Sequence, residues 1–221
     1  TGKNFEFGGS LIRPEATGFG ATYYVNEVLQ HEGDTFEGKT VAVSGFGNVA
    51  WGVCKKVAEL GGKVVTISGP DGYVYDPDGN TTPEKIDYLV EMRNSGRDRA
   101  QDYADKFGCK FVAKTKPWGE KVDIAMPCAT QNEINMEEIK KIIGNGTKYY
   151  IEVANMPTTN EALEYAQNQP GVIVAPSKAV NAGGVAVSAL EMCQNSMRYS
   201  WEAEEGDAKL KGIMKNIHKV T

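Results

Sequence analysis

The chain has 221 residues, of which 41% are apolar and 24% are charged, and its formal net charge is −5. A mildly acidic chain without a basic run has little with which to neutralise phosphates, so neither nucleic acid nor an anionic membrane surface is expected as a partner. No apolar stretch approaches the roughly 20 residues of a membrane-spanning helix, and the N-terminus has no signal-peptide pattern. Four widely spaced cysteines and two histidines argue against a disulfide framework and a structural zinc site. We therefore expect a cytoplasmic protein with reduced thiols.

The first predicted elements include a strand–helix–strand unit. Residues 15–31 have apolar side chains at helical spacing, and a glycine soon after them is a plausible stop. Residues 39–44 predict a buried strand, residues 48–60 an amphipathic helix, and residues 63–68 a second buried strand. A unit of this length is typical of a βαβ crossover, so the two strands should be parallel.

The alternation continues along the rest of the chain. Residues 70–79 are rich in turn residues and predict a hairpin or a loop. Further strands are expected at 110–113, 122–129, 148–154 and 171–177, and helices at 83–95, 99–108, 135–143, 160–168, 182–195 and 204–219. The pattern predicts one doubly wound (Rossmann-type) α/β domain over residues 1–221, with a mostly parallel sheet, helices on both faces and helical ends.

The stretch Gly45-Phe46-Gly47-Asn48-Val49-Ala50 fits the dinucleotide-binding pattern G-x-G-x-x-A. The first glycine permits a tight turn, and the second lets backbone N–H groups approach a pyrophosphate at the helix N-terminus. The alanine still allows close packing of the helix on the strand. Because a strand precedes this stretch and a helix and a second strand follow it, the pattern favours a phosphate site over a merely tight turn.

An acidic residue after the second strand usually binds the adenosine ribose of NAD, about 20 residues past the glycines. Asp71 lies slightly farther past the glycines than this spacing. Pro70-Asp71-Gly72 could also be a simple turn. Residues 64–82 contain no Arg or Lys to pair with a 2′-phosphate. Phe46 and Pro70 would present an apolar wall there, which a dianionic phosphate disfavours. We therefore expect NAD rather than NADP.

Five stretches together resemble the hexameric glutamate dehydrogenases of the Glu/Leu/Phe/Val dehydrogenase family over nearly the full chain. They are "GGSLIRPEATGFG" (8–20), "GFGNVAWG" (45–52), "SGPDGYVYDPDG" (68–79), "IEVANMPTT" (151–159) and "APSKAVNAGGVAVSALEM" (175–192). Nothing matches the family's glycine-rich substrate domain, which carries the catalytic lysines and aspartate. The resemblance therefore implies an isolated cofactor-binding domain without catalytic residues of its own. The start at Thr1 rather than methionine agrees with a piece of a longer protein.

The resemblance also implies individual roles. Arg13 and Thr17 would lie beside the cofactor, Asn48 would contact its pyrophosphate or ribose, and Ala129 and Thr130 would lie against the adenosine ribose. Asn155 would contact the nicotinamide ribose, Asn181 the carboxamide, and Ser188 a carboxylate of glutamate. The full set of expected cofactor-binding residues is Arg13, Thr17, Gly45, Phe46, Gly47, Asn48, Val49, Pro70, Asp71, Ala129, Thr130, Asn155 and Asn181.

Each implied role has a structural alternative. Thr17 could cap or pack within its own helix, and Ser188 could hydrogen-bond to its own helix. Asn155 could belong to a strand-end turn, and Asn181 could be the N-cap of the next helix. No metal site is expected.

The resemblance implies that the full-length protein reversibly deaminates L-glutamate to 2-oxoglutarate and ammonia, and that it is a homo-hexamer. The fragment would bind NAD(H) without turnover and would be a monomer or dimer. Three alternatives remain open: a free-standing nucleotide-binding module, a leucine, phenylalanine or valine dehydrogenase, and an NADP-preferring glutamate dehydrogenase.

Overall fold

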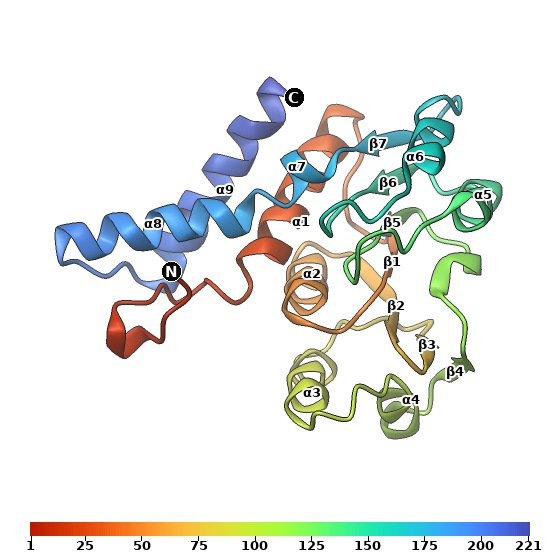
Figure 1. Ribbon diagram of the computed structural model, residues 1–221, viewed down its shortest axis with the longest axis horizontal. Helices are drawn as coiled ribbons and strands as arrows, with labels where there is room; N and C mark the ends of the chain where they lie inside the picture. The colour runs from red at the N-terminus through yellow and green to blue at the C-terminus, as the bar shows by residue number, and fades with distance from the viewer.

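The computed structural model describes residues 1–221 and contains a seven-stranded sheet in the order β4-β3-β2-β1-β5-β6-β7 (Figure 1). The strands are β1 (Thr40–Val43), β2 (Lys63–Gly69), β3 (Gly72–Tyr75), β4 (Lys110–Ala113), β5 (Ile124–Met126), β6 (Tyr149–Ile151) and β7 (Ile173–Ala175). Strands β2, β1, β5, β6 and β7 are parallel, whereas β3 pairs antiparallel with both β2 and β4. This confirms the doubly wound, mostly parallel sheet. It also resolves residues 70–79 as a hairpin rather than a loop.

The helices cover both faces of this sheet. They are α1 (Ala16–His31), α2 (Asn48–Glu59), α3 (Pro83–Asn94), α4 (Gln101–Phe107), α5 (Met136–Gly144), α6 (Asn160–Gln167), α7 (Ser177–Val180), α8 (Gly183–Met197) and α9 (Ala203–Val220), with 3₁₀ turns η1 (Phe5–Phe7) and η2 (Pro117–Gly119). None of the helices combines the length and the apolar character needed to cross a membrane. Strands β5, β6 and β7 are shorter than expected, because the predicted runs included loop residues beyond the strand ends.

Successive residues of the central strands face two separate apolar cores. Val41 and Val43 of β1 lie in the larger core, which includes side chains of α1, α2, α3, α4 and α9. Ala42 lies between them in sequence but belongs to the smaller core, with side chains of η2, α5 and α6. Since side chains of a strand alternate between faces, a strand buried on both sides must be apolar throughout. This explains why β1 has no alternating polar residues.

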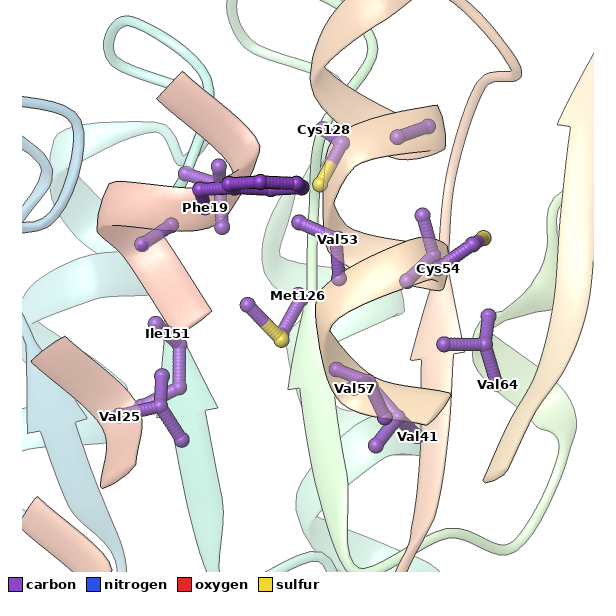
Figure 2. Close-up of a cluster of buried hydrophobic side chains, with 14 of the residues drawn as sticks. Phe19, Val25, Val41, Val53, Cys54, Val57, Val64, Met126, Cys128 and Ile151 are labelled. Atoms are coloured by element: carbon purple, nitrogen blue, oxygen red, sulfur yellow. The ribbon is translucent and has the colours of Figure 1, made fainter. Parts of the chain in front are cut away.

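Helices α1 and α2 pack on the same face of the sheet, where they contribute Phe19, Val25, Val53 and Val57 to the larger core (Figure 2). The two helices touch through their backbones at Gly18. A Cβ atom added there would lie 2.5 Å from the carbonyl oxygen of Val49 and 2.6 Å from the backbone nitrogen of Val53. The contact therefore requires glycine, and it determines where the N-terminus of α2 lies.

Helices α8 and α9 form an arm that extends away from the sheet, and the N-terminal segment lies along α8 (Figure 1). The buried carboxylate of Glu191 on α8 accepts hydrogen bonds from the backbone N–H groups of Gly2 (3.0 Å) and Ser10 (3.2 Å). The first turn of α8 packs on α1, where Gly183 lies against the backbone of Ala16 and Gly20. The N-terminal ends of α1 and α8 are thereby brought together.

Candidate functional site

The glycine-rich turn lies between the end of β1 and the start of α2. Gly45 has φ = 79°, a left-handed conformation that favours glycine, and its N–H donates to the Ser68 hydroxyl at 2.9 Å. Gly47 is the N-cap of α2 with an extended backbone, and a Cβ atom added to it would meet nothing within 4 Å. The free N–H groups and the dipole at this helix N-terminus favour an anion, and the open space beside Gly47 leaves room for one.

Two hollows adjoin this turn at the carboxyl ends of the parallel strands. The first has a volume of about 590 Å³ and is lined by Gly45, Phe46, Gly47, Ser68, Gly69, Pro70, Arg93, Asp98, Lys116, Ala129, Thr130, Gln131, Asn132 and Glu133. The second has a volume of about 430 Å³ and is lined by Arg13, Thr17, Val49, Cys128, Ala129, Gln131, Val153, Ala154, Asn155, Asn181, Gly184 and Val185. Ala129 and Gln131 line both hollows, so the two hollows form one groove. The groove crosses the point where the strand order reverses between β1 and β5. Open α/β sheets bind their ligands in this position.

The polar residues predicted for the nicotinamide half meet in the second hollow. The Asn181 side-chain amide donates to the Asn155 Oδ1 at 2.8 Å, so Asn181 does not cap α8, whose N-cap is Ala182. The Arg13 Nε donates to the Ser188 hydroxyl at 3.1 Å, and Ser188 makes no hydrogen bond to its own helix. Thr17 likewise makes no capping bond and lines the hollow. Asn181 is therefore not the N-cap of α8, Thr17 caps no helix, and Ser188 does not hydrogen-bond to its own helix, although Asn155 does precede a sharp turn at Met156 (φ = 46°).

Asp71 has a different place from the one expected for a ribose-binding carboxylate. Its two carboxylate oxygens accept hydrogen bonds from the backbone N–H groups of Ala100 (2.9 Å) and Gln101 (3.0 Å), at the start of α4. Asp71 lines neither hollow, whereas Pro70 lines the first. The structure therefore supports the turn alternative for Asp71, with an added role as the acceptor for the first N–H groups of α4.

Replacing Asp71 by alanine is expected to lower the free energy of unfolding by about 1 kcal/mol, because two N–H groups of α4 lose their acceptor. The dissociation constant of NADH should change less than about threefold. A lost ribose contact worth about 1.4 kcal/mol would instead change it about tenfold. Urea denaturation and fluorescence titration of the same sample measure both quantities, with Asp78→Ala at an exposed turn as the control. A tenfold loss of NADH affinity with unchanged stability would restore the ribose role.

Several residues of the first hollow were not predicted from the sequence. Gln131, Asn132 and Glu133 follow β5, and their position after the end of a central strand could have identified them. Arg93 comes from the last turn of α3 and contacts the Asn48 side chain, while Lys116 follows β4 and its ammonium donates to the Glu133 carbonyl oxygen. The first hollow thus has two basic side chains that the inspection of residues 64–82 did not include. Residues 64–82 lack Arg and Lys, but the fold brings both types from elsewhere.

Comparison with known proteins identifies the fold family. Residues 8–221 match the model of the Glutamate/Leucine/Phenylalanine/Valine dehydrogenase family. The chain belongs to this family. It is 66% identical over 218 residues to the NAD-specific glutamate dehydrogenase of Clostridium symbiosum, covering 99% of this chain and 48% of that protein. It is 50% identical, over the same shares, to the NADP-specific glutamate dehydrogenase of Escherichia coli.

Solved structures of the dehydrogenase family agree with this assignment. A glutamate dehydrogenase 66% identical in sequence superposes with a TM-score of 0.98, over 99% of this chain and 49% of that one. The glutamate dehydrogenase of Peptoniphilus asaccharolyticus is 31% identical and superposes with a TM-score of 0.75. The chain thus spans about half the length of the dehydrogenases that it matches.

Proposed function

We propose that this chain is the NAD(H)-binding domain of a glutamate dehydrogenase, whose remaining half carries the substrate domain with the catalytic lysine and aspartate. The observation that carries the proposal is the continuous groove over the ends of β1 and β5, with an open glycine turn at its centre. The names of the relatives support the choice of glutamate over leucine, phenylalanine or valine as the substrate. These relatives are about twice as long as this chain, which argues against a free-standing nucleotide-binding module.

The residues of the groove fit a dinucleotide in its two halves. The N-terminus of α2 would hold the pyrophosphate through backbone N–H groups beside Gly47, and Asn48 lies at the same helix end. Ala129 and Thr130 would lie against the adenosine ribose, and Asn155 and Asn181 against the nicotinamide. When bound, the cofactor accepts or donates a hydride at the nicotinamide ring, which is the chemistry of the whole enzyme.

The second hollow supplies orientation and no general acid or base. Thr17, Asn155 and Asn181 are neutral hydrogen-bonding groups, which fix a ring without titrating near neutral pH. Ser188 lines neither hollow, but its hydroxyl accepts from Arg13, which lines the second one, and there it would meet a carboxylate of glutamate. The water-activating lysine and the aspartate that relays its proton would come from the substrate domain. We therefore expect NAD(H) binding without turnover from this chain alone, a cytoplasmic location, and a homo-hexamer for the full-length protein.

The preference between NAD and NADP depends on two opposed features of the first hollow. Phe46 and Pro70 provide an apolar wall that disfavours a 2′-phosphate, and they support NAD. Arg93 and Lys116 line the same hollow and could pair with a 2′-phosphate, so an NADP-preferring enzyme is the second candidate. We favour NAD because Arg93 already contacts Asn48 and the Lys116 ammonium already donates to a carbonyl oxygen.

Fluorescence titration of this chain with NADH and with NADPH tests the proposal. We expect NADH to bind at least about tenfold more tightly than NADPH, a difference of ~1.4 kcal/mol. We also expect no glutamate-dependent formation of NADH by the chain alone. Absence of NADH binding would overturn the proposed function, and tighter NADPH binding would replace NAD by NADP. Turnover by the isolated chain would contradict the assignment of the catalytic residues to another domain.

A further inference from the structure

Glu133 is a buried carboxylate at the edge of the first hollow, and its side chain joins two segments of the groove. Its exposed fraction is 7%, and its Oε1 accepts three hydrogen bonds. The donors are the Ser44 hydroxyl at 2.8 Å and the backbone N–H groups of Ala129 at 3.1 Å and Thr130 at 3.4 Å. One oxygen atom thus connects the end of β1 with the loop that follows β5.

Ser44 extends this connection beyond the last paired residues of the two strands. Its side chain is buried, and its hydroxyl oxygen accepts from the backbone N–H groups of Cys128 at 2.9 Å and Ala129 at 3.2 Å. The hydroxyl proton is directed to Glu133. Since Ser44 immediately precedes Gly45, these bonds relate the glycine turn directly to the loop that would face the adenosine ribose.

The far end of the same loop is held by backbone groups. The N–H of Asn132 donates to the Met156 carbonyl oxygen and the N–H of Ile134 to the Pro157 carbonyl oxygen, each at 2.9 Å. These bonds hold the loop to the segment after β6, on the side away from β1. On the side of β1 the loop is held by the Ser44 hydroxyl, through Cys128 and Ala129, and by the Glu133 carboxylate, which also accepts from Thr130.

The carboxylate occupies this position at a cost in stability. Burial raises the pKa of the Glu133 carboxyl above its usual value, and the bonds from Ser44, Ala129 and Thr130 oppose that shift only in part. The Lys116 ammonium lowers the pKa further, but its hydrogen bond goes to the backbone oxygen of Glu133 rather than to the carboxylate. A group that is costly to bury and lies in a ligand groove points to a role in that groove.

We propose that Glu133 is a positioning residue for the cofactor: its Oε1 holds Ala129 and Thr130 at the separation from Gly45 that the adenosine half of a dinucleotide requires. Without this acceptor, the Thr130 N–H and the Ser44 hydroxyl proton lose their partner, and the Ala129 N–H keeps only its bond to the Ser44 oxygen, so the loop after β5 is held less firmly to the glycine turn. The inference rests on the proposed function, because the groove must bind a dinucleotide for its width to matter.

The test compares Glu133→Ala with Glu133→Gln in this chain. Alanine removes the acceptor, so the dissociation constant of NADH should rise about tenfold or more. Glutamine keeps an oxygen that can accept the same three bonds, and its amide replaces Oε2, which accepts no hydrogen bond from the chain. NADH binding by Glu133→Gln should therefore stay within about threefold of the unsubstituted chain.

The matched control is Glu191→Ala. Glu191 is also buried, with 1% of its surface exposed, and its carboxylate accepts from two backbone N–H groups, but it lines neither hollow. Its loss should lower the melting temperature and leave the NADH dissociation constant unchanged. A loss of NADH affinity in Glu133→Ala that exceeds the loss in Glu191→Ala, at similar melting temperatures, separates positioning from general stability. If Glu133→Ala fails to fold, Ser44→Ala removes one of the three donors and should weaken NADH binding in the same direction.

Amide hydrogen exchange, measured by NMR without cofactor, separates the positioning role of Glu133 from the proposed NAD(H)-binding function. In Glu133→Ala the amides of Ala129 and Thr130 should exchange faster than in the unsubstituted chain, and glutamine should restore their protection. Unchanged exchange at both amides would overturn the positioning role even if NADH binds. Faster exchange with an unchanged NADH dissociation constant would also overturn it, while leaving the proposed function intact. Absence of NADH binding by the unsubstituted chain would overturn both.

Discussion

Replacing Gly47 by alanine is expected to raise the dissociation constant of NADH about tenfold or more. The melting temperature should hardly change. The added Cβ atom meets no protein atom within 4 Å, and φ = −72° is open to any residue. The space beside Gly47 lies at the N-terminus of α2, where a pyrophosphate would approach the backbone most closely. The substitution therefore fills space that the folded chain leaves open but the cofactor needs.

Fluorescence titration and thermal denaturation of Gly47→Ala measure the two effects separately. Gly144→Ala is the control, since a Cβ atom there also meets nothing within 4 Å and the residue ends α5 away from both hollows. Both variants should unfold within about 1 kcal/mol of the original chain. NADH binding by Gly47→Ala that matches Gly144→Ala would mean that no phosphate approaches this turn.

Replacing Gly18 by alanine should lower the free energy of unfolding by at least ~1–3 kcal/mol. The added Cβ atom would lie 2.5 Å from the Val49 carbonyl oxygen and 2.6 Å from the Val53 backbone nitrogen. Because both contacts are backbone atoms, α1 and α2 must move apart, and the larger core between them and the sheet opens. NADH binding should weaken as well, since α2 carries the glycine turn at its N-terminus. Urea denaturation measures the loss of stability.

Gly212→Ala in α9 is the control of opposite sign. Gly212 is an exposed residue in the middle of α9, and an added Cβ atom there would meet nothing within 4 Å. Alanine there should raise the free energy of unfolding by ~0.5–1 kcal/mol, because it loses less conformational entropy on folding. If Gly18→Ala were as stable as the original chain, the close backbone contact of α1 with α2 would not be needed for the fold.

Local sequence patterns predicted most of the fold correctly. The unit of residues 39–68, the helix at residues 15–31 and the helices near residues 83–107 all appear close to their expected positions. Apolar periodicity and glycine or proline punctuation depend on neighbouring residues, so they can be identified without knowledge of the tertiary structure. The glycine turn at Gly45 and Gly47 belongs to the same class of local signal. Family resemblance supplied the polar residues of the second hollow.

Interactions between distant residues were not predictable in this way. The packing of α1 on α2 at Gly18 depends on a close approach that no periodicity reveals. The ribose-binding role expected for Asp71 followed from its place after β2. In the structure, its carboxylate accepts hydrogen bonds from the backbone at the start of α4. Arg93 and Lys116 reach the first hollow from α3 and from the loop after β4, with no local pattern to mark them.

The sequence by itself determined the alternation of strands and helices and the glycine-rich turn after β1, because both are properties of short, contiguous stretches. Only the tertiary structure decided which polar groups line the first hollow, since these come from segments far apart in the chain. In this structure Asp71 lines neither hollow, whereas Glu133, Arg93 and Lys116 line the first one. Side-chain hydrogen bonds and burial, rather than position along the chain, assign each of them its role.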